Sequence, residues 1–502
     1  MTRGAYLVYG RGIDPRVGAR VARAAAAIEA HTPAWLRDWI PSYDRIFVEY
    51  DPRRINARAL ADWARGLESG ERREGRLVEI PVRYGGLDLR EISERTGLGP
   101  EEVIRLHAGA SYRVYAVGFT PGFPFMAEVP EAIRLPRRDV PRKHVPAHSV
   151  GIAGVQTGIY PQESPGGWNL LGRTLVRVYD PHRARPFLLE PGDRVRFVPR
   201  AGDPPDPPES LELLLAGEGA TVLEVIEPGL LTLPVDDGRF RAGRFGLARS
   251  GPLDARSLGV ANRLLGNTPG MAALELNLAG PLLEAREVVT VALALQDAHG
   301  RIQAWARTLR RGERLDLRVL AGGARGYLAV PGGLALGRFL GSASPDLKGR
   351  IGRPLRVGDK LQAAAARSSL RRAARDWRRD GWMGPEVTLR LSPGPQADDA
   401  ALEALLRGRF RVAAADRMGV RLEGDAVPGG EVTSEGVPLG AVQVPPGGAP
   451  ILLLSDRGTI GGYAKPAVLH PADLARAGQL REGERLRFVL DPAARPYDVF
   501  EI

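Results

Sequence analysis

The residues best suited to chemistry gather in two segments that are rich in glycine and proline, Gly118–Arg173 and Ser434–Lys465. Glycine lets the backbone approach a ligand closely, and proline fixes a loop so that its side chains stay aimed. The first segment supplies Gln156, Thr157, Tyr160, Glu163 and Trp168, and the second supplies Glu435, Gln443, Asp456, Arg457, Tyr463 and Lys465. We predict that the two segments fold toward each other around one small carbonyl compound.

Lys465 stands out because lysine is rare in this chain. Of the 70 lysine and arginine residues, the only lysines are Lys143, Lys348, Lys360 and Lys465. Lysine offers a compact cation or a titratable amine, which arginine does not. We therefore predict four catalytic residues: Lys465 and Arg457 as clamps for phosphate or carboxylate, and Asp456 and Glu435 as acids that handle a metal or a proton. Seven further residues are predicted to bind substrate or nucleotide: Gln156, Thr157, Tyr160, Glu163, Trp168, Gln443 and Tyr463. The two glutamines are expected to form hydrogen bonds with an amide of the ligand.

Structural alternatives stay open for two of these predictions. Asp456 and Arg457 could form a local ion pair that holds a turn, and Trp168 could plug a barrel end. The usual catalytic patterns are missing: the chain has no cysteine, no P-loop, no Gly-x-Ser-x-Gly elbow and no His-Glu-x-x-His motif. Pro146 lies between His144 and His148, so they cannot align as metal ligands on a helix, and we predict no metal site within the protein.

Charge and hydropathy exclude two classes of partner. The net charge is +11, but the arginines are scattered and no nucleic-acid-binding motif accompanies them. The one dense stretch, Arg367–Arg379, is expected to be a short basic surface helix or loop. No run of about 18 apolar residues exists, and the first residues do not resemble a signal peptide. We expect a cytoplasmic protein that contacts neither nucleic acid nor membrane.

The elements that must position these residues divide the chain into units. Residues 1–76 read strand, helix, strand, helix, with Asp14 and Asn56 as helix caps, which predicts a small α+β domain. Residues 77–200 begin with a strand and two short helices and continue as short apolar runs between turns, which is typical of a barrel. The proline-rich stretch that opens 201–221 predicts a linker. Residues 222–385 and 386–502 again read as short strands.

A short sequence repeat occurs in two of these units. Glu190–Val198 reads EPGDRVRFV, and Glu482–Val489 reads EGERLRFV. In each copy a glycine and an acid form a tight turn, and alternating basic and apolar residues enter a strand. Since each copy lies at the end of a β-rich unit, the repeat predicts related barrels in tandem. The expected fold class is mainly β, with an α+β N-terminal domain.

Two sets of longer motifs resemble known families. GFTPGFPFM and VGIAGVQTGIYPQESPGGWNLLGRT resemble the KipI family, which is also known as the B subunit of 5-oxoprolinase. From Glu224 onward, segments such as DRMGVRLEG and SEGVPLGAVQVPPGGAPILLLSDRGTIGGYAKPAVL resemble KipA, the C subunit of 5-oxoprolinase. The resemblance implies a KipI N-terminal domain at 1–76 and cyclophilin-like β-barrels at 77–200, 222–385 and 386–502.

The resemblance also implies a function. The chain would be the fused B and C subunits of a bacterial ATP-dependent 5-oxoprolinase, which phosphorylate 5-oxoproline with ATP and Mg²⁺. A separate protein, similar to the A subunit of the same enzyme, would complete hydrolysis to glutamate. Two alternatives stay open: a KipI/KipA-type regulator that binds a sensor histidine kinase, and a carboxyltransferase-like protein that acts on a urea-type amide.

Overall fold

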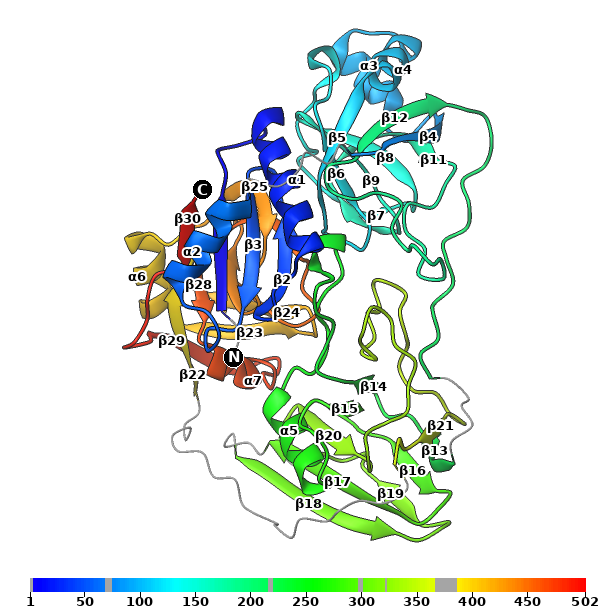
Figure 1. The fold of residues 1–502 in the computed structure, drawn as a ribbon, viewed down its shortest axis with the longest axis vertical. Helices are drawn as coiled ribbons and strands as arrows, with labels where there is room; N and C mark the ends of the chain where they lie inside the picture. Colours follow the sequence, from blue (N-terminus) through cyan, green and yellow to red (C-terminus); the bar gives the residue numbers. More distant parts are fainter. Residues whose placement is uncertain (1–2, 68–74, 215–219, 297–300, 321–322, 366–385) are drawn as a thin grey trace.

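The computed structural model describes residues 3–67, 75–214, 220–296, 301–320, 323–365 and 386–502. These residues are mainly β-strands, gathered into units that pack on one another (Figure 1). The arginine-rich stretch at 367–379 lies outside the described residues. Within the described part, no helix has the length and apolar character needed to cross a membrane.

The N-terminal unit is the expected α+β domain. It comprises β1 (Arg3–Val8), α1 (Pro15–Ala30), β2 (Leu36–Pro41), β3 (Arg45–Tyr50) and α2 (Ala57–Gly66). Both predicted helix caps are confirmed. The Asp14 carboxylate accepts a hydrogen bond from the Arg16 backbone N–H at 2.6 Å, and Asn56 accepts one from Ala59 at 2.9 Å. These bonds satisfy backbone donors that have no partner inside the helix.

The last strand of the chain completes the N-terminal sheet. β30 (Asp498–Glu501) pairs in parallel with β1, giving the order β2-β3-β1-β30. Figure 1 shows it in red beside the blue N-terminal strands. The structure therefore differs from the domain predicted at 386–502, because the final strand of that range belongs to the unit at the opposite end of the sequence. No local pattern in residues 498–501 indicates this partner.

The first barrel is closed by seven strands in the order β11-β4-β12-β5-β6-β9-β8. Its elements are β4 (Leu77–Tyr84), α3 (Leu89–Thr96), α4 (Pro100–Gly109), β5 (Ser111–Val117), β6 (Pro124–Ala127), η2 (Glu131–Ile133), β7 (Arg142–Val145), β8 (Ser149–Ala153), β9 (Gln156–Ile159), β10 (Ser164–Gly166), β11 (Asn169–Thr174) and β12 (Arg194–Pro199). The two short helices fall where the sequence predicts them.

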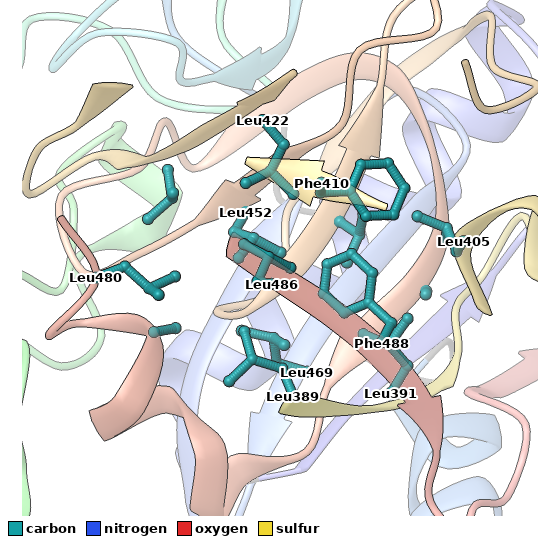
Figure 2. Packing of buried hydrophobic residues seen from close by; sticks show 14 of the residues in the cluster. Leu389, Leu391, Leu405, Phe410, Leu422, Leu452, Leu469, Leu480, Leu486 and Phe488 are labelled. Atoms are coloured by element: carbon teal, nitrogen blue, oxygen red, sulfur yellow. The ribbon is translucent and has the colours of Figure 1, made fainter. Parts of the chain in front are cut away.

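The C-terminal barrel repeats this topology. It contains β22 (Glu386–Pro393), α6 (Asp399–Arg407), β23 (Phe410–Ala415), β24 (Gly419–Gly424), β25 (Glu431–Gly436), β26 (Ala441–Val444), β27 (Ile451–Leu453), β28 (Ile460–Leu469), η4 (Pro471–Asp473), α7 (Leu474–Ala477) and β29 (Arg485–Leu490). Pairing of β22 with β28 closes the ring β28-β22-β29-β23-β24-β27-β26, and β25 is added at β28. Leucines and two phenylalanines fill its core (Figure 2).

The two copies of the sequence repeat form equivalent strands of the two barrels. β12 pairs in parallel with β4 and antiparallel with β5, and β29 does the same with β22 and β23. In each strand the apolar residues of the alternating pattern are buried, such as Phe197 in the first barrel and Phe488 in the second. The prediction of related barrels in tandem is therefore confirmed.

The unit between the barrels forms two sheets that share one core, with the orders β19-β16-β13-β21 and β14-β15-β20-β17-β18. Its elements are β13 (Thr221–Glu227), β14 (Leu231–Val235), η3 (Gly243–Phe245), α5 (Ala255–Leu264), β15 (Ala273–Asn277), β16 (Leu282–Ala285), β17 (Val289–Gln296), β18 (Ile302–Leu309), β19 (Arg314–Asp316), β20 (Arg325–Ala329) and β21 (Lys360–Gln362). Among the described strands the sheets stay separate, so the closed barrel predicted for 222–385 takes the form of a sandwich.

Candidate functional site: a cleft between the two barrels

A cleft of about 680 Å³ lies where the two barrels face each other. The first barrel contributes aromatic and basic residues near β7 and β10, and the C-terminal barrel contributes residues of β24, β25, β26 and β28. A turn of the sandwich unit adds Lys348. This volume is in the range of small-molecule sites.

An aromatic wall forms the side of the cleft that belongs to the first barrel. The rings of Tyr160 and Trp168 lie 5.0 and 5.5 Å from the ring of Phe123, both edge to face. All three side chains line the cleft. Burial raises the pKa of Tyr160 to about 12, so its hydroxyl stays protonated at neutral pH. The wall therefore offers flat apolar contact together with a neutral phenol.

Gln443 supplies a neutral polar group from the opposite wall. The residue is only 8% exposed, yet its side-chain amide makes no hydrogen bond to another described residue. Tyr463 of β28 lies on the same wall. A ligand amide or carboxylate that reached Gln443 would recover the missing hydrogen bonds.

Cations come from three different units. Arg137 belongs to the first barrel, Lys348 to the sandwich unit and Arg421 to β24 of the C-terminal barrel. None of the three side chains forms an ion pair with a residue that the structure describes, and all three residues are exposed. Desolvation by surrounding protein lowers the pKa of Lys348 below its ordinary value, against the opposing charges of Asp346, Asp416 and Asp456. These free cations suit an anionic ligand.

Acidic residues in the cleft are Asp139, Asp416 and Glu431. Within the described ranges, no three histidine or acidic side chains come together in a group that could hold a metal ion. The cleft itself therefore offers single carboxylates rather than a metal cage. This arrangement fits anion and amide recognition better than direct metal binding by the protein.

The structure brings four of the predicted binding residues together in this cleft: Tyr160, Trp168, Gln443 and Tyr463. Two of them come from each of the two glycine- and proline-rich segments. Trp168 packs edge to face against Phe123 and also lines the cleft.

The other binding residues of the first segment lie elsewhere. Gln156 donates a hydrogen bond to the hydroxyl of Tyr43 in the N-terminal unit. Thr157 is fully buried and contacts His107 at 3.1 Å inside the barrel. Glu163 is exposed and pairs with His144 at 2.9 Å. None of the three lines the cleft. Their predicted binding role is not supported by these positions, because packing or solvent takes up each polar group.

Glu435 and Lys465 form a buried ion pair inside the C-terminal barrel, where the barrel meets the N-terminal unit. The Lys465 ammonium lies 2.9 Å from the Glu435 carboxylate, and Arg45 of β3 contacts the same carboxylate at 2.6 Å. Lys465 is 0% exposed, and burial lowers its pKa even though Glu435 pulls it upward. A clamp must reach its ligand, so the predicted clamp role of Lys465 does not fit this geometry, nor does a proton-handling role for Glu435.

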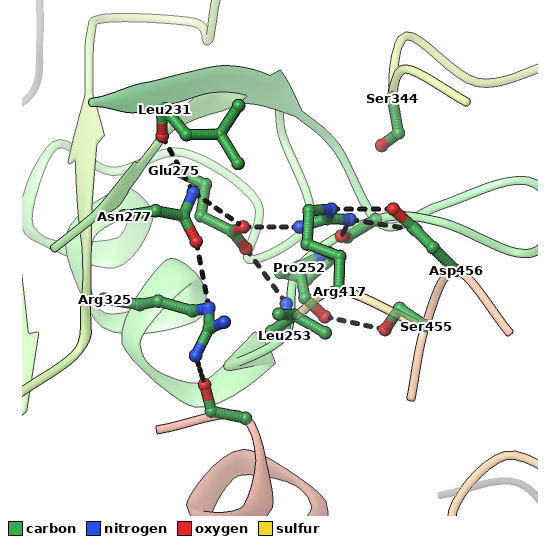
Figure 3. A network of polar contacts seen from close by, with 12 residues as sticks. Leu231, Pro252, Leu253, Glu275, Asn277, Arg325, Ser344, Arg417, Ser455 and Asp456 are labelled. Carbon is green, nitrogen blue, oxygen red and sulfur yellow. Dashed lines mark hydrogen bonds and ion pairs between the residues drawn. The ribbon is translucent and has the colours of Figure 1, made fainter. Parts of the chain in front are cut away.

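Arg457 and Asp456 lie at two further junctions. The Arg457 guanidinium contacts Glu49 of the N-terminal unit at 3.2 Å. Asp456 accepts from Arg417 at 2.8 Å, and Arg417 in turn pairs with Glu275 of the sandwich unit (Figure 3). Arg457 thus joins two units directly, whereas Asp456 supports Arg417, which reaches the sandwich unit. The local Asp456–Arg457 pair considered from the sequence is not formed. Their predicted catalytic roles do not fit these positions.

Three cleft cations were missed by sequence reasoning: Arg137, Lys348 and Arg421. A signal existed for one of them. The scarcity of lysine that marks Lys465 applies equally to Lys348, which the structure places in the cleft. Arg137 and Arg421 are two arginines among many, and nothing local separates them from the rest.

Comparisons with known proteins find relatives of both the N-terminal and the C-terminal part of the chain. The family model "Carboxyltransferase domain, subdomain C and D" matches residues 2–189, and "Carboxyltransferase domain, subdomain A and B" matches residues 245–490. The B subunit of 5-oxoprolinase from Bacillus subtilis is 39% identical over 211 residues, covering 38% of this chain and 86% of that relative. The C subunit of 5-oxoprolinase from Escherichia coli is 32% identical over 286 residues, covering 53% of this chain and 91% of the relative.

Matches to other proteins differ in extent. The match to the 5-oxoprolinase B subunit of Escherichia coli O157:H7 spans 60% of that relative at 50% identity. The crystal structure of TTHA0988 superimposes with a TM-score of 0.91 at 50% identity, covering 97% of this chain and 100% of the other. A urea amidolyase of Lachancea kluyveri is 31% identical over 53% of this chain, which corresponds to only 17% of the amidolyase.

Proposed function

The chain belongs to the carboxyltransferase-domain family that contains the B and C subunits of 5-oxoprolinase, and we propose that it acts as both components, fused, of an ATP-dependent 5-oxoprolinase. One observation carries the proposal. The cleft is lined jointly by a barrel from the half similar to the B subunit, and by a barrel from the half similar to the C subunit. A site that needs both halves explains why two subunits would act together and why they can be joined in one chain.

The cleft matches 5-oxoproline in chemistry and leaves room for a second ligand beside it. The substrate is a small ring that carries one carboxylate and one lactam amide. Its ring packs on Tyr160 and Trp168, its carboxylate pairs with Arg137 or Arg421, and its amide meets the free side chain of Gln443. Each contact uses a group that the folded protein leaves without a partner or presents as flat apolar surface.

Lys348 is the residue we assign to the activation step. An amide carbonyl is a poor electrophile, and transfer of the γ-phosphoryl group of ATP to the lactam oxygen turns that oxygen into a leaving group. Negative charge on the transferring group is stabilised by cations placed beside it. Lys348 is a free ammonium at the cleft, held by a turn of a different unit from the aromatic wall.

ATP and Mg²⁺ are part of the proposal. The cleft carboxylates Asp139, Asp416 and Glu431 are single, so a Mg²⁺ ion would arrive with the nucleotide and be held mainly by its phosphates. When bound, the ion supplies charge neutralisation at the β- and γ-phosphates. The residues of this chain bind and orient the lactam.

A reconstituted reaction tests the proposal. The purified chain is mixed with a protein similar to the A subunit of 5-oxoprolinase, together with 5-oxoproline and Mg-ATP, and glutamate and ADP are measured. We expect ADP formation that requires 5-oxoproline, and glutamate that requires the partner as well. Absence of 5-oxoproline-dependent ADP formation, together with tight binding to a histidine kinase, would support the regulator alternative instead.

A second candidate is carboxyl transfer to a urea-type amide, which the similarity to urea amidolyase favours. The same cleft would hold a planar amide against the aromatic wall. Incubation with a carboxylated biotin carrier and urea distinguishes the two: carboxylation of urea without ATP consumption by this chain would select this candidate.

A further inference from the structure

A second pocket of about 390 Å³ lies on the molecule apart from the cleft and shares no lining residue with it. Three units meet there. Arg37 and Arg53 come from the N-terminal unit, and Arg249 and Arg256 come from the sandwich unit, Arg249 from the loop after η3 and Arg256 from helix α5. The C-terminal barrel closes the pocket with residues around η4 and α7. The proposed 5-oxoprolinase chemistry uses none of these residues.

The pocket wall carries a clear excess of positive charge. Four arginines face one lining acid, Asp237. Outside the wall, Asp51 is shared by two of these arginines. It binds Arg53 through two hydrogen bonds of 2.8 and 2.9 Å and Arg37 through one of 3.5 Å. One carboxylate cannot neutralise two guanidinium groups, so positive charge remains on this side of the pocket.

Arg249 is the arginine whose guanidinium has the most N–H donors left for a ligand. Its guanidinium lies 4.2 Å from the centroid of the Phe240 ring, and it forms no ion pair with any part of the chain that the structure describes. Stacking on Phe240 holds the planar group in place while its N–H donors stay available. A guanidinium held in this way is prepared for a bidentate contact with phosphate or carboxylate oxygens.

The remaining wall supplies one unused hydroxyl and an apolar floor. Ser250 is 2% exposed, and its hydroxyl has no hydrogen-bond partner. It lines the pocket beside Arg249. Phe240, Leu253 and Leu439 give apolar surface next to the charges. The pocket thus combines an anion site with room for a small organic group.

We propose that this arginine-walled pocket binds the phosphate group of a small phosphorylated compound. Phosphate is preferred over a carboxylate because several guanidinium groups, two of which share one carboxylate, match a multiply charged anion. The pocket volume exceeds the needs of a bare phosphate, so an ester with a compact organic part fits. The proposal does not depend on the function of the cleft, because binding is measured without turnover.

Calorimetric titration with inorganic phosphate tests the site. The buffer chloride is adjusted so that ionic strength stays constant, and no ATP, 5-oxoproline or partner is present. We expect saturable binding by the wild type and a dissociation constant about tenfold weaker in Arg249→Gln, which loses one charge-assisted contact. Arg249→Lys keeps the charge but loses the fork, so we expect an intermediate loss.

Two matched variants separate the pocket from general charge and from the cleft. Arg90→Gln removes an exposed helix arginine paired with Glu94, and Arg137→Gln removes a cleft cation. Both are expected to keep the component of phosphate binding that Arg249→Gln weakens. Equal thermal unfolding midpoints of Arg249→Gln and wild type show that the weaker binding is not a folding defect. Lack of saturable phosphate binding by the wild type, or loss in Arg137→Gln instead of Arg249→Gln, overturns the proposal.

A competition arm identifies the source of the phosphate. ADP is titrated into the phosphate-saturated protein. Displacement that Arg249→Gln weakens assigns the pocket to a nucleotide, whereas phosphate binding that ADP leaves unchanged assigns it to a smaller phosphate ester.

Discussion

Lys348 and Lys465 are two of only four lysines in the chain, and the structure gives them opposite surroundings. Lys348 is exposed at the cleft between the barrels and has no ion-pair partner among the described residues. Lys465 is completely buried in the C-terminal barrel and is paired with Glu435, whose carboxylate also pairs with Arg45 of the N-terminal unit. The side chain is the same, but one is available to a ligand and the other is committed to an internal ion pair beside the junction of two units.

The same contrast extends to the regions around the two lysines. The cleft carries polar groups without partners, such as Gln443, which a ligand can satisfy. The junctions carry charges that are satisfied within the protein, such as Arg457 with Glu49. A buried charge costs several kcal/mol unless it is paired, so the junction pairs fix how the units are oriented. The orientation in turn sets the shape of the cleft.

The largest expected effect comes from removing the lysine of the buried Lys465–Glu435 pair. Lys465→Met leaves the Glu435 carboxylate with Arg45 as its remaining cation and Gln396 as a hydrogen-bond donor, and we expect it to lower the free energy of unfolding by about 3–5 kcal/mol. The double variant Glu435→Gln/Lys465→Met leaves no unpaired buried charge, so it should recover most of this loss. Chemical denaturation measures both.

The double variant also decides the role of Lys465. If the pair is structural, the refolded double variant keeps most of its 5-oxoproline-dependent ATP turnover. A double variant that is as stable as the wild type but inactive would restore the catalytic role that the sequence predicts for Lys465 and would remove the contrast with Lys348.

A second junction residue predicts a pH dependence of stability. Burial, followed by repulsion from Glu49, raises the pKa of Asp38 to about 7, while its carboxylate accepts from the backbone N–H of Gly243. Between about pH 4 and 7 the folded state holds a proton on Asp38 that the unfolded chain releases. Stability contributed by this proton is fully present below the unfolded pKa and is lost as pH rises through the folded pKa.

The corresponding variant is Asp38→Asn, which stays neutral and can still accept from Gly243. We expect the wild type to lose on the order of 3 kcal/mol between about pH 4 and pH 8 through this group, and the variant to lack that component. Denaturant titrations at several pH values measure it. Asp62→Asn, an exposed residue of α2 paired with Arg65, serves as control and should leave the profile unchanged.

For Lys348 in the cleft, we expect a substitution to reduce activity without reducing stability. Lys348→Met removes the free ammonium, and we expect kcat/KM for 5-oxoproline-dependent ATP hydrolysis to fall about a hundredfold, equivalent to about 2.7 kcal/mol. Lys360→Met, at an exposed position of β21, is the matched control. Equal activity of the two variants would show that Lys348 is not part of the site.

The smallest effect is expected at Gln443. Gln443→Leu removes a neutral amide that meets the substrate, so we expect KM for 5-oxoproline to rise about tenfold. The free energy of unfolding should stay the same, because the Gln443 amide makes no hydrogen bond to another described residue. A variant with lower stability and unchanged KM would place Gln443 with the junction residues instead.

The sequence determined the local elements and the repetition between them. Asp14 and Asn56 cap helices as their side-chain chemistry requires, and the two copies of the glycine, acid and alternating strand pattern close two barrels of one topology. These features depend on residues close together in the chain. Long motifs of the two halves likewise indicated the family, since family motifs are contiguous.

Only the tertiary structure decided which polar residues face a ligand. Glu435 and Ser434 are neighbours on β25, yet Ser434 lines the cleft while Glu435 pairs with Arg45, 390 positions earlier in the chain. Likewise, the strand that pairs in parallel with β1 is β30, at the other end of the chain. Availability depends on what other units cover, and packing between distant segments is set by the summed fit of whole surfaces rather than by local residue type.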